Sequence, residues 1–182
     1  LNNADMALYE SKRQGKNRAT FFNYQLQQFA ADRIQLEHEL KYALSNNEFE
    51  LYFQPLIRLK NRQVVMLEAL LRWNHPEKGL VGPDQFIDIA EQCGLIIPIG
   101  KWVLEQACST IVRALEQGEP CVPIAINISA KQLTNINFAQ ETQQIIESYE
   151  VDPAMIEMEI TESTIMENME ESLKQLNYLK GL

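Results

Sequence analysis

The sequence predicts an α/β fold built from parallel βα units, either closed as a barrel or arranged as a doubly wound sheet. From Val64 onward, segments with the strand period of two alternate with segments that have the helical period of 3.6. Each predicted strand here has one polar and one apolar face, whereas a strand covered by helices should be apolar on its covered side. The polar faces are therefore expected to point together into a barrel lumen or a cleft.

The segments before this alternation are predicted from periodicity and from residues that end helices. Residues 2–14 should form a helix that ends at Gly15, and residues 19–22 should form a short strand. Leucine and phenylalanine residues form one stripe over residues 24–44, which predicts a helix that leads into the next domain.

The later elements follow from changes of period and from proline and glycine at helix ends. Residues 49–59 and 64–73 are expected to form a hairpin around the polar turn at 60–63. Pro83 and Gly94 bracket one of the helices that follow. The remaining elements are predicted as helix 83–92, helix 99–117, strand 123–129, helix 138–149, strand 155–161 and helix 170–180.

Composition restricts the classes of function. The chain has 182 residues and is 46% hydrophobic, which is enough for one domain with a core and excludes a disordered or collagen-like chain. Its net charge of −9 argues against binding to a nucleic-acid polymer. An anionic ligand would therefore need a divalent cation or a few placed arginines to neutralise it.

The cysteines and the hydropathy pattern indicate a cytoplasmic location. Cys93, Cys108 and Cys121 fit neither a disulfide framework nor a C-x-x-C metal site, so we expect reduced, mostly buried thiols. No segment approaches the roughly 18 apolar residues of a membrane span, so no membrane contact is expected in this segment. The chain begins with Leu1, so we expect an upstream part, which could anchor a parent protein in a membrane.

Glu68, Asn127 and Glu159 occupy the polar faces of three different predicted strands. Their spacing corresponds to βα units of roughly 30 residues, so they are expected at comparable heights. Two carboxylates and an amide oxygen are hard ligands that suit Mg²⁺ or Mn²⁺ better than zinc. Arg72 is placed to meet a phosphate, and Gln54 to hydrogen-bond a base or a second phosphate. A network of polar side chains that pair only with one another is the alternative.

Five ordered motifs resemble those of EAL-type cyclic di-GMP phosphodiesterases. They are Gln54-Pro-Leu, Glu68-Ala-Leu-Leu-Arg-Trp73, Phe86-Ile-Asp-Ile-Ala-Glu-Gln-Cys-Gly-Leu-Ile96, Asn127-Ile-Ser-Ala-Lys-Gln-Leu133 and Glu159-Ile-Thr-Glu-Ser163. The resemblance implies an incomplete TIM-like (β/α)8 barrel whose first strand is antiparallel, and opening of cyclic di-GMP to linear pGpG.

The resemblance also implies residue roles. It implies that Glu68, Asn127 and Glu159 bind Mg²⁺ or Mn²⁺, with Glu68 part of the catalytic set. It further implies that Gln54, Leu70 and Arg72 contact the dinucleotide. Glu162 is expected to stabilise the loop after its strand.

The two ends of the chain add expectations about domains. Ala4-Asp-Met-Ala-Leu-Tyr9 and Lys12-Arg-Gln-Gly-Lys-Asn-Arg18 resemble the end of a GGDEF diguanylate cyclase domain. We expect a GGDEF remnant over 1–22, a linker helix over 23–44 and the first part of an EAL domain over 45–182. The family's later Asp-Asp, Lys, Glu and Gln motifs are not reached, so no turnover is expected from this chain alone.

Two alternatives remain open for the parent protein. One is a degenerate EAL domain that acts as a cyclic di-GMP receptor, and the other is a protein-interaction module that has lost the ligand. A partial barrel also leaves an open sheet edge and uncovered apolar surface, which predicts a homodimer.

Overall fold

The protein is described from a computed structural model of the chain. The structure describes residues 21–161 and 168–181, together with Ala4, Ala7, Leu8, Ser11, Asn17 and Ala19. The chain divides into two compact units, Leu1–Tyr42 and Ala43–Leu182, and each is considered by itself.

The main element of the first unit is helix α2 (Tyr24–Ala43), which confirms the helix predicted there. Exposed pairs at i and i+4 support it: Lys41 Nζ lies 3.3 Å from Glu37 Oε1, and Gln35 donates to Glu39 over 2.8 Å. Most of the predicted helix over 2–14 lies outside the described residues.

The short strand predicted at residues 19–22 is wrong for the residues described there. Ala19, Phe21 and Phe22 have no strand conformation, and the described sheet begins only at Phe49. A strand requires a partner for its backbone hydrogen bonds, and the described part of this unit contains none.

The second unit is built on a five-stranded mixed sheet in the order β1-β2-β4-β5, with β3 paired to β2. Its strands are β1 (Phe49–Arg58), β2 (Gln63–His75), β3 (Gly79–Val81), β4 (Ile124–Asn127) and β5 (Ile156–Glu159). The β1–β2 and β2–β3 pairs are antiparallel, whereas β2–β4 and β4–β5 are parallel. The antiparallel first strand and the parallel βα units were both predicted.

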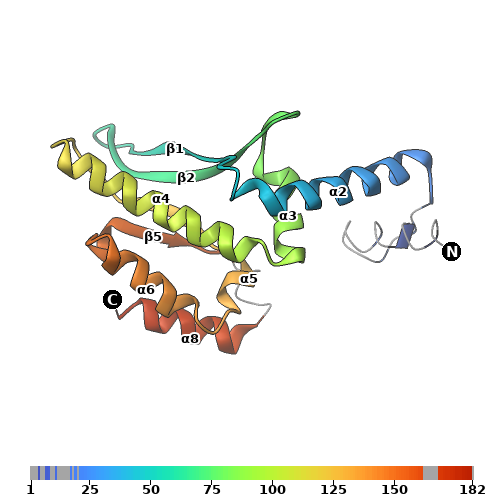
Figure 1. Cartoon of the computed structure of the whole chain (residues 1–182). Coiled ribbons are helices and arrows are strands. Elements are labelled where there is room, and N and C mark those ends of the chain that lie inside the picture. The colour runs from blue at the N-terminus through green and yellow to red at the C-terminus, as the bar shows by residue number, and fades with distance from the viewer. Residues whose placement is uncertain are drawn as a thin grey trace. The chain divides into compact units, whose positions relative to one another are not determined.

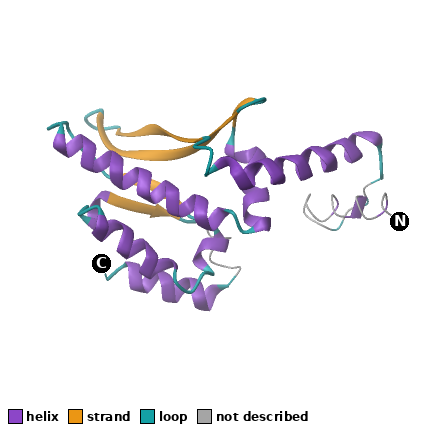
Figure 2. Cartoon of the chain, in the orientation of Figure 1, coloured by secondary structure: helices purple, strands orange, loops and turns teal. Residues whose placement is uncertain are grey.

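Helices connect the parallel strands, as Figures 1 and 2 show for this unit. The connecting helices are α3 (Pro83–Cys93), α4 (Ile96–Glu116), α5 (Ala130–Leu133) and α6 (Phe138–Ser148), with a 3₁₀ turn at Pro153–Met155, and α8 (Met169–Leu179) follows β5. Helix α3 ends where Gly94 adopts a φ of 78°, a left-handed conformation that glycine tolerates best. Helix α4 begins earlier than predicted because Pro98 is accommodated in its first turn, where backbone N–H groups lack intrahelical partners.

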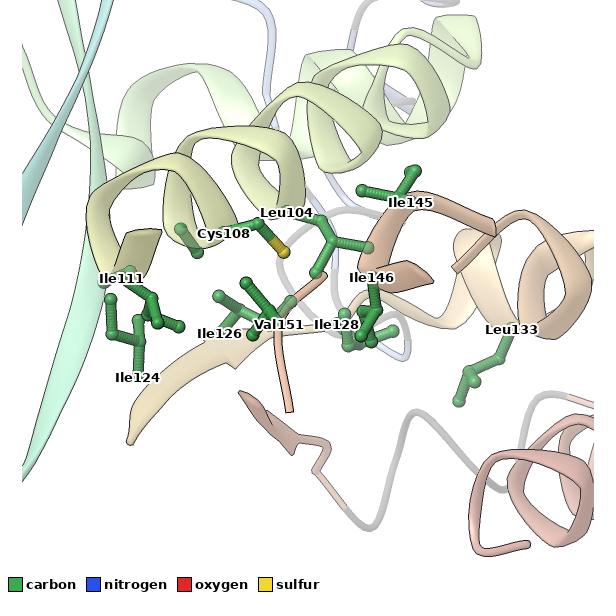
Figure 3. Packing of buried hydrophobic residues seen from close by; sticks show 12 residues of the cluster. Leu104, Cys108, Ile111, Ile124, Ile126, Ile128, Leu133, Ile145, Ile146 and Val151 are labelled. Atoms are coloured by element: carbon green, nitrogen blue, oxygen red, sulfur yellow. The ribbon is translucent and has the colours of Figure 1, made fainter. Parts of the chain in front are cut away.

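The apolar faces of β4 and β5 pack against the helices. Leu104, Cys108 and Ile111 of α4 share a buried cluster with Ile124 and Ile126 of β4, as Figure 3 shows. Full burial of such a side chain contributes about 1.5–3 kcal/mol. This packing covers one face of the sheet with helices and leaves the polar faces of the strands on the other side, as the alternation predicted.

An aromatic cluster joins the start of β1 to the end of β2. Trp73 is fully buried and lies 5.7 Å from Phe86 and 6.1 Å from Phe49 between ring centroids. Its indole nitrogen donates to Glu48 Oε2 over 2.9 Å, which satisfies the ring's polar atom. The cluster therefore fixes the position of the β2 end that carries Arg72.

The cysteines differ in part from the prediction. All three are free thiols, but Cys93 is exposed and Cys121 is half-buried, whereas Cys108 is fully buried. Cys93 is the last residue of α3, and its sulfur contacts the backbone oxygen of Ala90 at 3.7 Å. The periodicity of α3 did not reveal that this position faces solvent.

Candidate metal and ligand site

Three neighbouring strands bring Glu68, Asn127 and Glu159 together. Asn127 and Glu159 are the last residues of β4 and β5, and their Cα atoms are register partners in the parallel pair. Asn127 Nδ2 donates a hydrogen bond of 2.9 Å to Glu68 Oε1 on β2. The structure thus places the three predicted side chains at one location on the polar face of the sheet, near the carboxyl ends of parallel strands.

The backbone after Asn127 is fixed by its own hydrogen bonds. Ile128 N donates to Glu159 O over 2.9 Å, so the β4–β5 contact continues past the last residue of β4. Ser129 then caps α5: its hydroxyl accepts from Gln132 N, and Gln132 Oε1 accepts from Ser129 N over 3.0 Å. This capping box holds the segment that orients Asn127.

The side chains present fit a hard divalent cation. Glu68 and Glu159 supply carboxylate oxygens, and Asn127 carries an amide oxygen beside the nitrogen that contacts Glu68. Among the described residues no group of three or more His, Cys, Asp or Glu side chains could hold a metal, so a site here depends on the Asn127 oxygen. Oxygen donors of this kind suit Mg²⁺ or Mn²⁺.

The hydrogen bond between Asn127 and Glu68 also belongs to the alternative interpretation, in which polar side chains on the strands pair with one another. Glu68 and Glu159 are both half-buried and Asn127 is exposed, so the location is open to solvent on one side. The pairing therefore shows that the side chains meet, while their role as metal ligands stays a prediction.

The β1–β2 hairpin places the other predicted residues next to this location. Gln54 is the register partner of Glu68, and Tyr52 is the register partner of Leu70. Directly opposite residues of an antiparallel pair lie on the same face, with Cβ atoms about 4.5–5.5 Å apart. Gln54, Leu70 and Arg72 therefore lie on the face that carries Glu68.

Arg72 extends this row and is held by two groups. Its Nη1 donates to the backbone oxygen of Leu71 over 2.9 Å, and its guanidinium carbon lies 5.6 Å from the centroid of the Tyr52 ring. That distance is within the range of a cation–π contact. No role for Tyr52 was predicted from the sequence; the period of two shared by β1 and β2 was the available signal.

Two features lie away from this location or outside the described residues. Glu162, the predicted loop-stabilising residue, lies outside the residues that the structure describes. A small cavity lies on the opposite, helical side of the sheet, lined by α4 and α6 residues that include Gly100 and Thr142. It therefore does not belong to the candidate site.

Taken together, the chain has an α/β fold with a mixed sheet, an antiparallel first strand and a polar cluster at the carboxyl ends of its parallel strands. This arrangement defines a partial barrel domain whose polar cluster lies at the end of the strands where barrel enzymes carry their active sites.

The chain belongs to the EAL domain family, whose model matches residues 37–182. It is 37% identical over 180 residues to the bifunctional diguanylate cyclase/cyclic di-GMP phosphodiesterase MucR of Pseudomonas aeruginosa, and this match covers 99% of the chain and 26% of MucR. It is also 37% identical to the cyclic di-GMP phosphodiesterase NbdA of the same organism, over the whole chain and 23% of NbdA. The chain thus spans about a quarter of the length of these relatives.

Solved structures confirm the fold class. The structure of the MucR phosphodiesterase in complex with c-di-GMP superposes with a TM-score of 0.76 at 37% identity, covering 81% of this chain and 60% of that one. The EAL enzyme Bd1971 in its cGMP-bound form gives a TM-score of 0.74 at 36% identity, covering 85% of this chain and 44% of that one. The incomplete EAL barrel predicted from the sequence is therefore confirmed.

Proposed function

We propose that this chain is part of a metal-dependent phosphodiesterase that opens cyclic di-GMP to linear pGpG in bacterial signalling. The observation that carries the proposal is the meeting of Glu68 with Asn127, which is itself the register partner of Glu159. The identity of 37% with proteins named as cyclic di-GMP phosphodiesterases supports it.

In this proposal Glu68, Asn127 and Glu159 hold Mg²⁺ or Mn²⁺ through their side-chain oxygens. When bound, such a cation supplies activation of water and neutralisation of phosphate charge. The protein's own contribution is positioning: three strand positions fix the ligands before the substrate arrives, so little reorganisation is needed. In the overall reaction a water oxygen forms a new bond to phosphorus, and one ribose oxygen leaves with a proton.

Gln54, Leu70 and Arg72 are proposed to bind the dinucleotide. Arg72 offers a guanidinium to a phosphate oxygen, which is a charge-assisted hydrogen bond. Gln54 offers an amide beside Glu68. Leu70 offers an apolar contact between Glu68 and Arg72 on the same face of β2. Glu162 is proposed to stabilise the loop that follows Glu159.

The remaining parts of the proposal concern the whole protein. Relatives match the chain over 99% to 100% of its length, and the name of MucR includes a diguanylate cyclase, which supports a GGDEF remnant at residues 1–22. A linker helix over 23–44 and an EAL domain from residue 45 are proposed with it. Within the part of the chain that the structure describes, no helix is long and apolar enough to cross a membrane. A cytoplasmic location is proposed from the free thiols.

The test is hydrolysis of cyclic di-GMP by the complete protein with Mn²⁺, followed as pGpG by chromatography. Glu68→Gln should abolish turnover, whereas Glu157→Gln, an exposed carboxylate on the same strand as Glu159, should retain it. Equal rates for wild type and Glu68→Gln would overturn the assignment. Metal-dependent binding without turnover would identify a receptor instead.

This chain by itself is expected to be inactive, because it spans 60% of the solved MucR phosphodiesterase. Calorimetry with cyclic di-GMP and Ca²⁺ then asks whether the described half of the site binds at all. Turnover by the isolated chain above that of its Glu68→Ala variant would contradict this expectation.

A further inference from the structure

Arg72 carries a positive charge next to an acidic residue, yet the two are not paired. Glu50 on β1 is its direct register partner across the antiparallel pair. Opposite charges at such positions commonly form a cross-strand ion pair. In the described part of the chain, no ion pair joins Arg72 to a carboxylate.

A neighbouring amide accounts for this separation. Asn74, two residues beyond Arg72 on the same face of β2, donates its Nδ2 to Glu50 Oε2 over 2.8 Å. The Glu50 carboxylate is thereby drawn along the strand toward Asn74. Arg72 instead bonds the backbone oxygen of Leu71 and lies over the Tyr52 ring.

We propose that Tyr52 and Asn74 are positioning residues that keep the Arg72 guanidinium available to an anionic ligand, Tyr52 by supporting it and Asn74 by withholding the competing Glu50 carboxylate. This inference rests on the proposed function, in which that ligand is the phosphodiester of cyclic di-GMP. It adds two residues that the family motifs quoted above do not include.

The physical basis is competition for one cation. A guanidinium paired with an internal carboxylate must break that pair before it can bind phosphate, which weakens the ligand. The face of an aromatic ring attracts a cation but carries no negative charge. The Tyr52 ring can therefore hold the Arg72 guanidinium without neutralising its charge. Tyr52 is 45% exposed, so its ring is a support at the surface and is not a buried core residue.

The hairpin geometry makes this arrangement possible. Because β1 runs antiparallel to β2, the sequence Glu50-x-Tyr52-x-Gln54 lies beside Arg72-x-Leu70-x-Glu68 in reverse order. Tyr52 therefore stands diagonally across from Arg72, and Glu50 stands diagonally across from Asn74. Diagonal neighbours in such pairs lie within reach of aromatic and long side chains.

The test compares variants of the complete protein by the Kd for cyclic di-GMP with Ca²⁺ and by kcat and KM with Mn²⁺. Tyr52→Leu should weaken binding about 2-fold to 5-fold, which is the size expected for an exposed cation–π contact. In the kinetic assay this loss should raise KM and leave kcat nearly unchanged. Tyr52→Phe keeps the ring face and should bind like wild type. Asn74→Ala should weaken binding about 2-fold to 5-fold, and adding Glu50→Gln should restore it.

A double-variant cycle separates support of Arg72 from direct contact with the ligand. In an Arg72→Ala background, Tyr52→Leu and Asn74→Ala should have no further effect on kcat/KM, because both act through the missing guanidinium. A further loss in that background would overturn the proposal. So would wild-type binding by Tyr52→Leu, or failure of Glu50→Gln to rescue Asn74→Ala.

The same data separate this inference from the proposed function. If wild type does not bind cyclic di-GMP, the proposed function fails and this inference falls with it. If wild type binds and Arg72→Ala does not, while Tyr52→Leu and Asn74→Ala bind like wild type, the proposed function stands and only this inference is overturned.

Discussion

The side-chain amide of Asn127 donates a hydrogen bond of 2.9 Å to the carboxylate of Glu68, 59 residues away in the sequence. The contact crosses from β4 to β2, two parallel strands that are neighbours in the sheet but are separated in the chain by β3, α3 and α4. It shows that a parallel βα arrangement, and not local sequence, brings these two polar groups together.

Metal binding should depend on the two carboxylates of this location. At a Mg²⁺ concentration ten times Kd, ligand linkage should stabilise the wild-type protein by about 1.4 kcal/mol, which thermal unfolding can detect as a higher Tm. Glu68→Gln and Glu159→Gln should lose this shift because each removes an anionic oxygen ligand. Glu157→Gln serves as the control for loss of one charge, and an unchanged Mg²⁺ shift in Glu68→Gln would rule out the assigned ligands.

Gln175 should be important for stability, although it is a polar residue. It is only 7% exposed; its Oε1 accepts from Ala139 N over 2.9 Å, and its Nε2 donates to Ile136 O over 3.1 Å. Gln175→Ala leaves both backbone groups without this partner, which should lower the free energy of unfolding by about 1–3 kcal/mol. Urea denaturation measures this change in the free energy of unfolding, and Asn177→Ala, at an exposed position of the same helix, serves as the control. Equal loss in both variants would contradict this role.

We expect position 100 to require glycine, because the Gln132 side chain leaves no room there for a Cβ atom. A Cβ at this position would lie 2.0 Å from Gln132 Nε2, and Gln132 is only 4% exposed and caps α5. Gly100→Ala should therefore destabilise the protein by about 1–3 kcal/mol through overpacking. The double variant Gly100→Ala with Gln132→Ala should lose less than the sum of the two single changes in urea denaturation. Strict additivity would show that the two positions do not interact.

Alkaline pH should weaken the fold through Cys108. Burial raises the pKa of this thiol from 9.0 to about 11. The unfolded chain then releases the proton at lower pH than the folded one, so this contribution is intact below pH 9 and is lost as pH rises from about 9 to 11. The loss should reach about 2 to 3 kcal/mol. Cys108→Ala should flatten this part of the stability profile, and an identical pH profile in the variant would contradict the assignment.

The edge of the described sheet predicts self-association of the chain. In the described part of the chain β1 is paired with β2 alone, which leaves one side of a ten-residue strand without backbone partners. We expect light scattering to give twice the monomer mass. Proline substitution at exposed Ile57 should favour the monomer by removing an N–H of this strand. A monomer mass at every concentration would refute the prediction.

The sequence by itself determined which face of each strand is polar and which is apolar. Side chains alternate along a strand whatever its surroundings, so Ile124 and Ile126 could be assigned to the core and Asn127 to the opposite row of β4. The longer helices α2, α3, α4, α6 and α8 were likewise predicted within a few residues, because amphipathic periodicity and residues such as Pro83 and Gly94 act locally.

Short elements were beyond this local signal. Strand β3 has only three residues, and it is defined by its antiparallel pairing with β2, in which Val81 is the register partner of Trp73. Helix α5 has four residues and depends on the reciprocal bonds between Ser129 and Gln132. Neither is long enough for a period to be recognised.

Only the tertiary structure decided what the polar side chains touch. Glu50 could have paired with Arg72, and the period of two allows it, but Asn74 takes the carboxylate and Tyr52 takes the cation. Glu68 could have contacted Gln54 alone, but the parallel β2–β4 pair brings Asn127 to it. A residue's own sequence neighbours fix its face, whereas the choice among partners on that face depends on strand order and register, which arise from the packing of the whole domain.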